Sequence, residues 1–187
     1  MANVNHNTLT DPYLHEPKGA STASAGQIYV ADGAGSGDWI ENSRVFGGYL
    51  TFSTGSPYAH SVTTSDTVLN PTFSASTNNG FTGLSSPNAR VRYDGVETIN
   101  ASMDAIFSIQ QSSGTSRQVQ MALFKNGSEL TGSRMIATAA SGEWNVLSLK
   151  FNTTLATNDY LEVFIKADSS ATINFASGYL RINGIAA

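Results

Sequence analysis

The sequence predicts an all-β protein, a β-sandwich preceded by an extended, turn-rich N-terminal arm. Three observations lead to this prediction. No ten-residue window has the apolar spacing of an amphipathic helix. From residue 88 onward, short apolar runs recur at regular spacing with turn residues between them. Asn126-Gly127 separates two of these runs, at a point where a tight hairpin turn requires positive φ.

Residues 1–46 form the predicted arm. They are polar, and Pro12 and Pro17 disfavour a helix. Segment 13–39 is rich in glycine around one short apolar run at 27–30. A flexible linker would not need apolar side chains, so we interpret this segment as an anchor that lies against another protein. The residues expected to make those contacts are Tyr13, Leu14, His15, Ile28, Tyr29, Val30 and Trp39.

Residues 47–87 connect the arm to the sandwich, and the sequence leaves two interpretations open. They form a small subdomain of their own, or they supply the first strands of the sandwich. Residues 88–187 hold the strongest strand pattern, but several runs, such as 117–125 and 160–167, are apolar on both faces. A solvated sheet face is polar. We therefore expect part of the outer face to be covered by a second subunit or by the arm.

Composition excludes several classes of function. The net charge is −4, and the ten Lys and Arg residues form no basic run, so neither a nucleic-acid partner nor a membrane partner is expected. The chain has no cysteine, which excludes disulfides and thiolate metal sites. No apolar stretch approaches the ~20 residues of a membrane helix. The N-terminus also lacks the charged and apolar regions of a secretory signal.

No catalytic residue, metal ligand or cofactor is predicted. The glycine run at 33–37 lacks the following helix and lysine of a phosphate-binding loop. The three histidines are dispersed along the chain. The carboxylate pairs Asp94/Glu97 and Asp159/Glu162 are interpreted as solvated groups rather than a glycosidase pair. A bound calcium ion stays open, because oxygen ligands are plentiful although no EF-hand series occurs.

Residues 88–187 resemble a known family. The matching elements are L-F-K-N-G at 123–127, L-x-x-N-D-x-L-x-V at 155–163 and F-x-S-G-Y-L at 175–180. This pattern resembles the jelly roll of tumour necrosis factor and of the complement globular head, with Asn158 where the family usually has glycine. The resemblance implies a jelly-roll β-sandwich that forms a compact homotrimeric knob. It also implies aromatic residues along the threefold axis, for which the candidates are Phe124, Tyr160 and Phe164.

Residues 15–39 are similar to N-terminal segments of structural proteins from tailed bacteriophages. An arm followed by a trimeric knob is similar to phage head-decoration proteins and head fibres. The resemblance implies a non-enzymatic virion protein, made in the host cytoplasm and located on the capsid surface. It would be a capsid decoration (cement) protein whose arm binds the major capsid protein and stabilises the head. The alternatives are a tail- or head-fibre knob that binds a receptor or host surface glycan and, less favoured, a carbohydrate-active enzyme.

Overall fold

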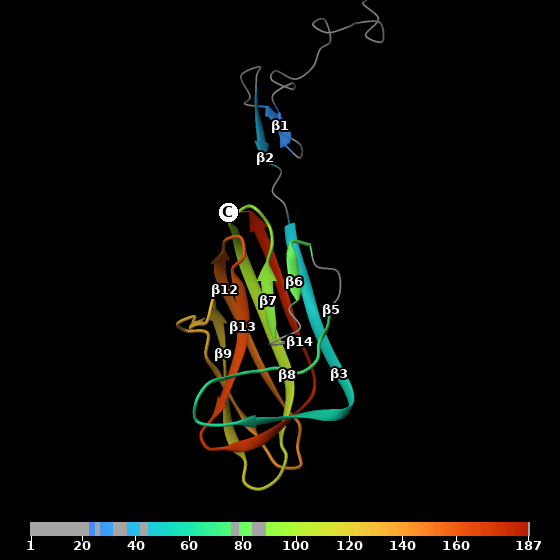
Figure 1. The fold of residues 1–187 in the computed structure, drawn as a ribbon, viewed down its shortest axis with the longest axis vertical. Coiled ribbons are helices and arrows are strands. Elements are labelled where there is room, and N and C mark those ends of the chain that lie inside the picture. The colour runs from blue at the N-terminus through green and yellow to red at the C-terminus, as the bar shows by residue number, and fades with distance from the viewer. Residues whose placement is uncertain are drawn as a thin grey trace, which may run out of the picture. The chain divides into compact units, whose positions relative to one another are not determined.

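The computed structural model describes residues 23–24, 27–31, 37–41, 45–75, 79–83 and 89–186. The chain divides into two compact units, residues 1–43 and residues 44–187. The described residues form strands and turns without any α-helix, which confirms the predicted all-β class. Figure 1 shows the strands with the labels used below.

The described residues of the first unit form a β-hairpin. Its strands are β1 (Gln27–Ala31) and β2 (Gly37–Glu41), and they pair antiparallel from Gln27↔Glu41 to Ala31↔Gly37. Both strands fall within the predicted arm. A single two-stranded sheet has no second layer to pack against, so it buries little apolar surface by itself.

The second unit is a sandwich of two sheets. The five-stranded sheet has the order β12-β8-β14-β3-β5. Its strands are β3 (Val45–Val62), β5 (Ser74–Ala75), β8 (Ile99–Gln111), β12 (Asn145–Leu155) and β14 (Ala171–Ala186). In Figure 1 the long strands β3, β8, β12 and β14 lie along the long axis of the sandwich, and neighbouring strands are antiparallel.

The seven-stranded sheet has the order β10-β9-β13-β7-β6, with β11 paired to β9 and β4 paired to β13. Its strands are β4 (Thr67–Val68), β6 (Phe81–Gly83), β7 (Arg90–Tyr93), β9 (Arg117–Lys125), β10 (Ser128–Glu129), β11 (Met135–Ala139) and β13 (Tyr160–Ala167). Within the segment 47–87, β3 and β5 belong to the first sheet, whereas β4 and β6 belong to the second. Both sheets of the sandwich therefore contain strands from that segment.

The last strand, β14, lies in the middle of the five-stranded sheet. It pairs with β3 on one side and with β8 on the other, and Ile185 is in register with both Val45 and Asn100. The register shifts between Phe175 and Gly178. A Cβ at Gly178 would lie 2.2 Å from the Phe107 ring, so this irregularity requires glycine.

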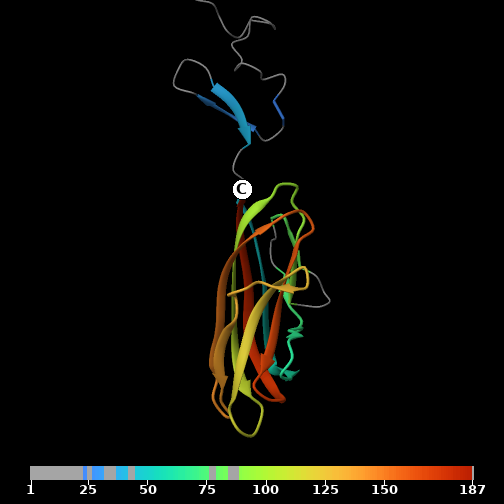
Figure 2. The same cartoon turned by 90° about the vertical axis from the view of Figure 1, so that its left-hand side faces the viewer.

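The hydrophobic core lies between the two sheets, which Figure 2 shows from the side. Side chains alternate between core and surface most clearly in β12, where Leu147 and Leu149 are buried while Val146 and Ser148 are exposed. The largest fully buried side chains come from both sheets and include Tyr93, Phe107, Phe175, Leu69, Ile99, Met103, Ile109, Met121, Leu123, Leu147, Leu155 and Leu161.

The predicted tight turn at Asn126-Gly127 is present between β9 and β10. Both residues have positive φ, 51° for Asn126 and 80° for Gly127. This combination is the type I′ geometry that Asn-Gly favours, because its twist matches that of the flanking strands. Asn158 also has positive φ, at 69°, which explains why asparagine can stand at this position where the resembling family has glycine.

Candidate assembly surfaces

The β1–β2 hairpin holds four of the seven predicted anchoring residues. Tyr29 is paired directly with Trp39, and their rings meet edge to face with centroids 5.4 Å apart. Ile28 and Val30 alternate with Tyr29 along β1, so they project from the opposite face, where they are 43% and 42% exposed. The other three predicted residues lie outside the part of the chain that the structure describes: Tyr13, Leu14 and His15.

The hairpin also has open edges. Among the described strands, β1 and β2 pair only with each other, so the outer edge of each has no neighbouring strand. Such an edge can accept a strand from another protein. The hairpin thus offers an aromatic face, an aliphatic face and two strand edges.

The three residues predicted at a trimer axis share the outer face of the seven-stranded sheet. Phe124 on β9 and Phe164 on β13 stack with ring centroids 4.0 Å apart. Tyr160 lies beneath the guanidinium of Arg90, which is 4.4 Å from the ring centroid. Arg90 also donates a hydrogen bond to the buried carboxylate of Glu162 at 2.8 Å. All three aromatic rings therefore have partners within their own chain.

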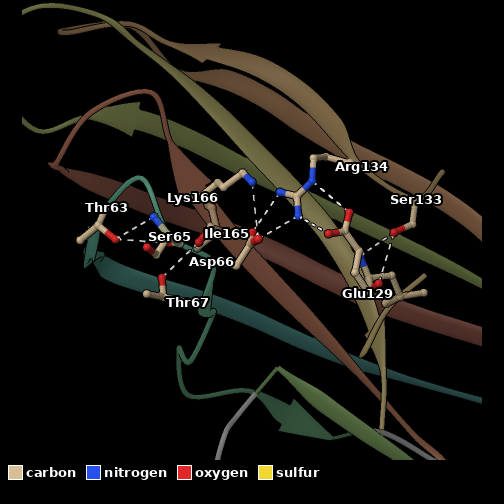
Figure 3. Close-up of polar contacts among 10 residues, drawn as sticks. Thr63, Ser65, Asp66, Thr67, Glu129, Ser133, Arg134, Ile165 and Lys166 are labelled. Atoms are coloured by element: carbon tan, nitrogen blue, oxygen red, sulfur yellow. Dashed lines mark hydrogen bonds and ion pairs between the residues drawn. The ribbon is translucent and has the colours of Figure 1, made fainter. Parts of the chain in front are cut away.

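A network of four charged side chains crosses the same sheet. Arg134 donates two hydrogen bonds of 2.9 Å to Asp66 on one side and bonds of 3.0 and 2.7 Å to Glu129 on the other, as Figure 3 shows. Lys166 adds a contact of 3.5 Å to Asp66. The hydrogen bonds to Glu129 are the largest cause of the raised pKa of Arg134.

This network ties together segments that lie on opposite sides of the β9–β13 pair. Asp66 precedes β4, which pairs with β13, and Glu129 belongs to β10, which pairs with β9. Ala122 is fully buried although it stands opposite Phe164, on the outer side of the sheet. The stacked rings and long charged side chains therefore account for the apolar pattern on both faces of β9 and β13.

The outer face of the five-stranded sheet is different, and we call it the open face. The described structure places no further layer over it. Tyr49 is 46% exposed and Ile185 is 55% exposed. In the same row of the sheet as Tyr49, Asp104 accepts a hydrogen bond of 3.1 Å from Arg181, and Lys150 lies 3.9 Å from Asp104. The Asp104 contact raises the pKa of Arg181.

The described part of the open face carries several hollows. The first, of about 790 Å³, lies at the ends of β8, β12 and β14, and it is lined by amide and hydroxyl side chains together with Ile185. The second, of about 430 Å³, contains Asp104, Lys150 and Arg181. The third, of about 340 Å³, includes Ile106 and Tyr179. The outward polar residues of the first hollow are Asn100, Ser102, Asn152, Thr154 and Asn183.

At one margin of the open face, further apolar side chains are exposed where β11 meets β12, and we call this margin the β11–β12 edge. Met135 and Ile136 of β11 are 48% and 60% exposed. Trp144, just before β12, and Val146 are 44% and 62% exposed. Met135 lines the same hollow as Lys150 of β12, so the two strands meet at this edge. The outer side of β12 has no sheet partner among the described strands.

Of the carboxylates that the sequence marked as pairs, Asp94, Asp159 and Glu162 have cationic partners, whereas Oε2 of Glu97 is buried without a hydrogen-bond partner. Asp94 accepts from Arg92 at 2.6 Å. Burial alone would raise the pKa of Asp159, but hydrogen bonds from Lys125 and Asn126 outweigh it and lower the pKa. Asn126 donates to Asp159 at 2.7 Å and accepts from the Tyr160 amide at 2.9 Å. These contacts fix the turns at one end of the sandwich.

His60 lies between two hydroxyl groups. Its Nδ1 is 3.1 Å from the Tyr58 hydroxyl and its Nε2 is 3.3 Å from the Thr67 hydroxyl. Burial lowers the pKa of His60, against a raising contribution from a hydrogen bond with Asn70. Within the described residues, no group of three or more His, Asp or Glu side chains is arranged to hold a metal ion. The described residues also contain no helix that is long and apolar enough to span a membrane.

Sequence reasoning did not find the open face or the β11–β12 edge. The outward positions of β8, β12 and β14 are mainly Asn, Ser and Thr, which resemble a solvated surface. Their apolar members, such as Val146 and Ile185, stand far apart in the sequence and come together only through strand pairing. The sequence of β12 does carry one signal. Because side chains alternate along a strand, inward Leu147 and Leu149 predict that Val146 projects outward.

Comparisons with known proteins give fold similarity only. No protein-family model and no curated protein matches the chain. Among solved structures, Eiger TNF from S. frugiperda is 10% identical, with a TM-score of 0.51 over 75% of this chain and 92% of that one. Murine APRIL is 13% identical, with a TM-score of 0.47 over 75% and 98% of the two chains. The PRD1 vertex protein P5 is 12% identical, with a TM-score of 0.45 over 75% and 96%.

The similarity to Eiger TNF and the two-sheet topology agree with the fold expected from the sequence. The sandwich of this chain has a tumour necrosis factor-like jelly-roll fold.

Proposed function

We propose that the chain is a non-enzymatic virion structural protein, a homotrimeric decoration protein of a tailed-phage head. The proposal is carried by one observation: exposed apolar side chains gather at two places on the sandwich, Tyr49 and Ile185 on β3 and β14 of the open face, and Met135, Ile136 and Trp144 at the β11–β12 edge. The similarity of residues 15–39 to phage structural proteins supports a place on a virion. The jelly-roll fold supports a compact knob.

Two different surfaces favour a ring of copies. In a cyclic trimer each subunit contacts its neighbours through two unlike patches, whereas a twofold dimer uses one self-complementary patch. Packing the β11–β12 edge of one copy against the open face of the next would cover Trp144 and Met135 with Tyr49 and Ile185. Apolar area removed from water contributes roughly 25 cal/mol per Å². The alternative trimer interface is the one predicted from the sequence, with Phe124, Tyr160 and Phe164 along the threefold axis.

The arm, residues 1–46, would attach the trimer to the major capsid protein. Binding only the assembled shell stabilises it by mass action at every occupied site. Three arms on one knob give avidity, so each contact can be weak. The outer edge of β1 or β2 would add to a sheet edge of the capsid subunit, while Tyr13, Leu14 and Trp39 enter apolar pockets.

Removal of residues 1–43 tests this proposal, because the sandwich begins at residue 44. We expect the truncated chain to sediment as a trimer and to lose binding to purified capsids. Continued decoration of capsids would disprove the role of the arm, and a monomer would disprove the trimer. Electron microscopy of virions with the labelled full chain would locate it on the head, on the tail or on neither.

A second function, glycan binding by a fibre knob, is favoured by the hollow of about 790 Å³ on the open face. Asparagine and hydroxyl side chains offer both donors and acceptors to sugar hydroxyls. This function needs the open face to be accessible, so it competes with the ring described above. Binding of residues 44–187 to host polysaccharide, lost in Asn183→Ala, together with tail labelling would favour it over the decoration protein.

A further inference from the structure

We propose that the β1–β2 hairpins of three copies associate with one another through Ile28 and Val30, forming what we call a collar within the arms. This inference rests on the proposed homotrimer. It assigns the two faces of the hairpin to different partners: the aliphatic face to the neighbouring copies and the aromatic face to the particle.

The hairpin needs a partner to be stable. A two-stranded sheet alone is marginal in water, and a third strand or a covering layer is needed for independent stability. Tyr29 and Trp39 partly cover each other, because they are directly opposite and in contact. Ile28 and Val30 remain almost half exposed. The uncovered apolar surface of the hairpin is therefore the aliphatic face.

The short segment between β2 and β3, which we call the tether, limits which surfaces the hairpin can reach. Three residues, 42–44, join Glu41 of β2 to Val45 of β3. Four Cα steps reach at most about 14 Å. Val45 is in register with Ile185, a residue of the open face. If that face lies between copies, each tether begins at an interface with a neighbouring copy.

Tethering then favours association of like hairpins. A short linker holds two attached groups at an effective concentration of about millimolar. The apolar contact between two hairpins is small and therefore weak. It can form at this effective concentration although it would not form between free hairpins. Asp38 limits the contact, because its register with Val30 places it on the same face. Three carboxylates near one axis would repel one another, so Asp38→Asn should strengthen the collar.

The absence of cysteine from the chain makes disulfide cross-linking a clean test. Val30→Cys places a thiol on the aliphatic face. Ala31→Cys is the matched control, because it is the next residue of β1, is also exposed, and projects to the other face. Both variants would be made in the full chain and oxidised mildly at several protein concentrations, after sedimentation has established the oligomeric state.

We expect Val30→Cys to give covalent dimers from up to about two thirds of the chains, since one thiol of three is left over. The rate should not depend on protein concentration, and Ala31→Cys should cross-link at least about tenfold more slowly. A trimer in which the two variants cross-link equally, or not at all, would overturn the collar and leave the homotrimer standing. A monomeric chain would instead overturn the homotrimer, and the collar with it.

A second variant separates association from thiol geometry. Ile28→Ser with Val30→Ser should make the trimer dissociate at about tenfold higher concentration than the unchanged chain. A dissociation concentration equal to that of the unchanged chain would show that the aliphatic face contacts no other copy.

Discussion

Phe124 and Phe164 stack on the outer face of the seven-stranded sheet, with ring centroids 4.0 Å apart and an interplanar angle of 28°. They sit diagonally across the β9–β13 pair, because Phe164 stands opposite Ala122 and Phe124 opposite Glu162. Each ring therefore shields part of the other within one chain. This contact offers an intramolecular reason for the apolar residues on both faces of these strands.

The stacked pair leads to a prediction that separates two possible interfaces. Phe164→Ser should lower the free energy of unfolding by about 2 kcal/mol, since it removes a partly buried ring and an aromatic pair. It should leave the oligomeric state unchanged. Tyr49→Glu and Ile185→Glu on the open face should instead dissociate the trimer. Sedimentation and urea unfolding measure both quantities. Dissociation by Phe164→Ser alone would place the interface on the seven-stranded sheet.

The Arg134 network should contribute to stability through its hydrogen bonds to two carboxylates. Arg134→Met keeps much of the apolar stem but removes four hydrogen bonds to Asp66 and Glu129. We expect a loss of about 1 kcal/mol, reduced in 1 M salt because the groups are partly exposed. Lys166→Met is the control, since Lys166 makes a single contact of 3.5 Å in the network. An equal loss in both variants would argue against a special role for Arg134.

Local features of the fold could be predicted because local residues determine them. The Asn126-Gly127 turn follows from the ability of both residues to adopt positive φ. The alternation of buried and exposed residues in β12 likewise follows from the alternation of apolar and polar residues in its sequence. In contrast, the place of residues 47–87 depends on β3 pairing with β14, and Val45 and Ile185 are 140 residues apart. No local pattern encodes such a pairing.

The candidate surfaces were harder to predict than the fold. The sequence identified the apolar residues of the hairpin, because Ile28, Tyr29 and Val30 are adjacent in the chain. It gave no reason to connect Tyr49 with Ile185, which share the open face only after the sheet forms. It also could not say that Arg90 covers Tyr160. Exposure is a property of packing, and composition alone does not decide it.

Asn126 should be required for its side chain as well as for its backbone. Asn126→Asp removes the donor to Asp159 and places two carboxylates together. We expect a loss of about 1–2 kcal/mol at pH 7 that shrinks below pH 4, where the carboxylates become protonated. Asn126→Gly keeps the turn and adds no charge, so its cost should be smaller and nearly independent of pH. Urea unfolding at both pH values tests this, and matching pH profiles would contradict it.

Acidification should weaken the sandwich in two separate steps. Burial lowers the pKa of His60 below 6.5, so the folded state favours the neutral ring. Stability from this preference is present above pH 6.5 and is lost as the pH falls through the folded-state pKa. Asp94 and Asp159 also have pKa values lowered from 3.8, so their contribution is present above pH 3.8 and is lost below it. The histidine step therefore comes first.

Residues 44–187 allow the first step to be assigned, since His60 is the one histidine of that segment. His60→Gln retains a hydrogen-bonding side chain between Tyr58 and Thr67 but cannot take up a proton in this range. The variant should show a flat unfolding free energy from pH 6.5 down to about 4.5, where the unchanged segment declines, and both should fall together below pH 3.8. A decline of the same size in His60→Gln would mean that another group binds the proton, because linkage requires the titrating residue to carry the pH dependence.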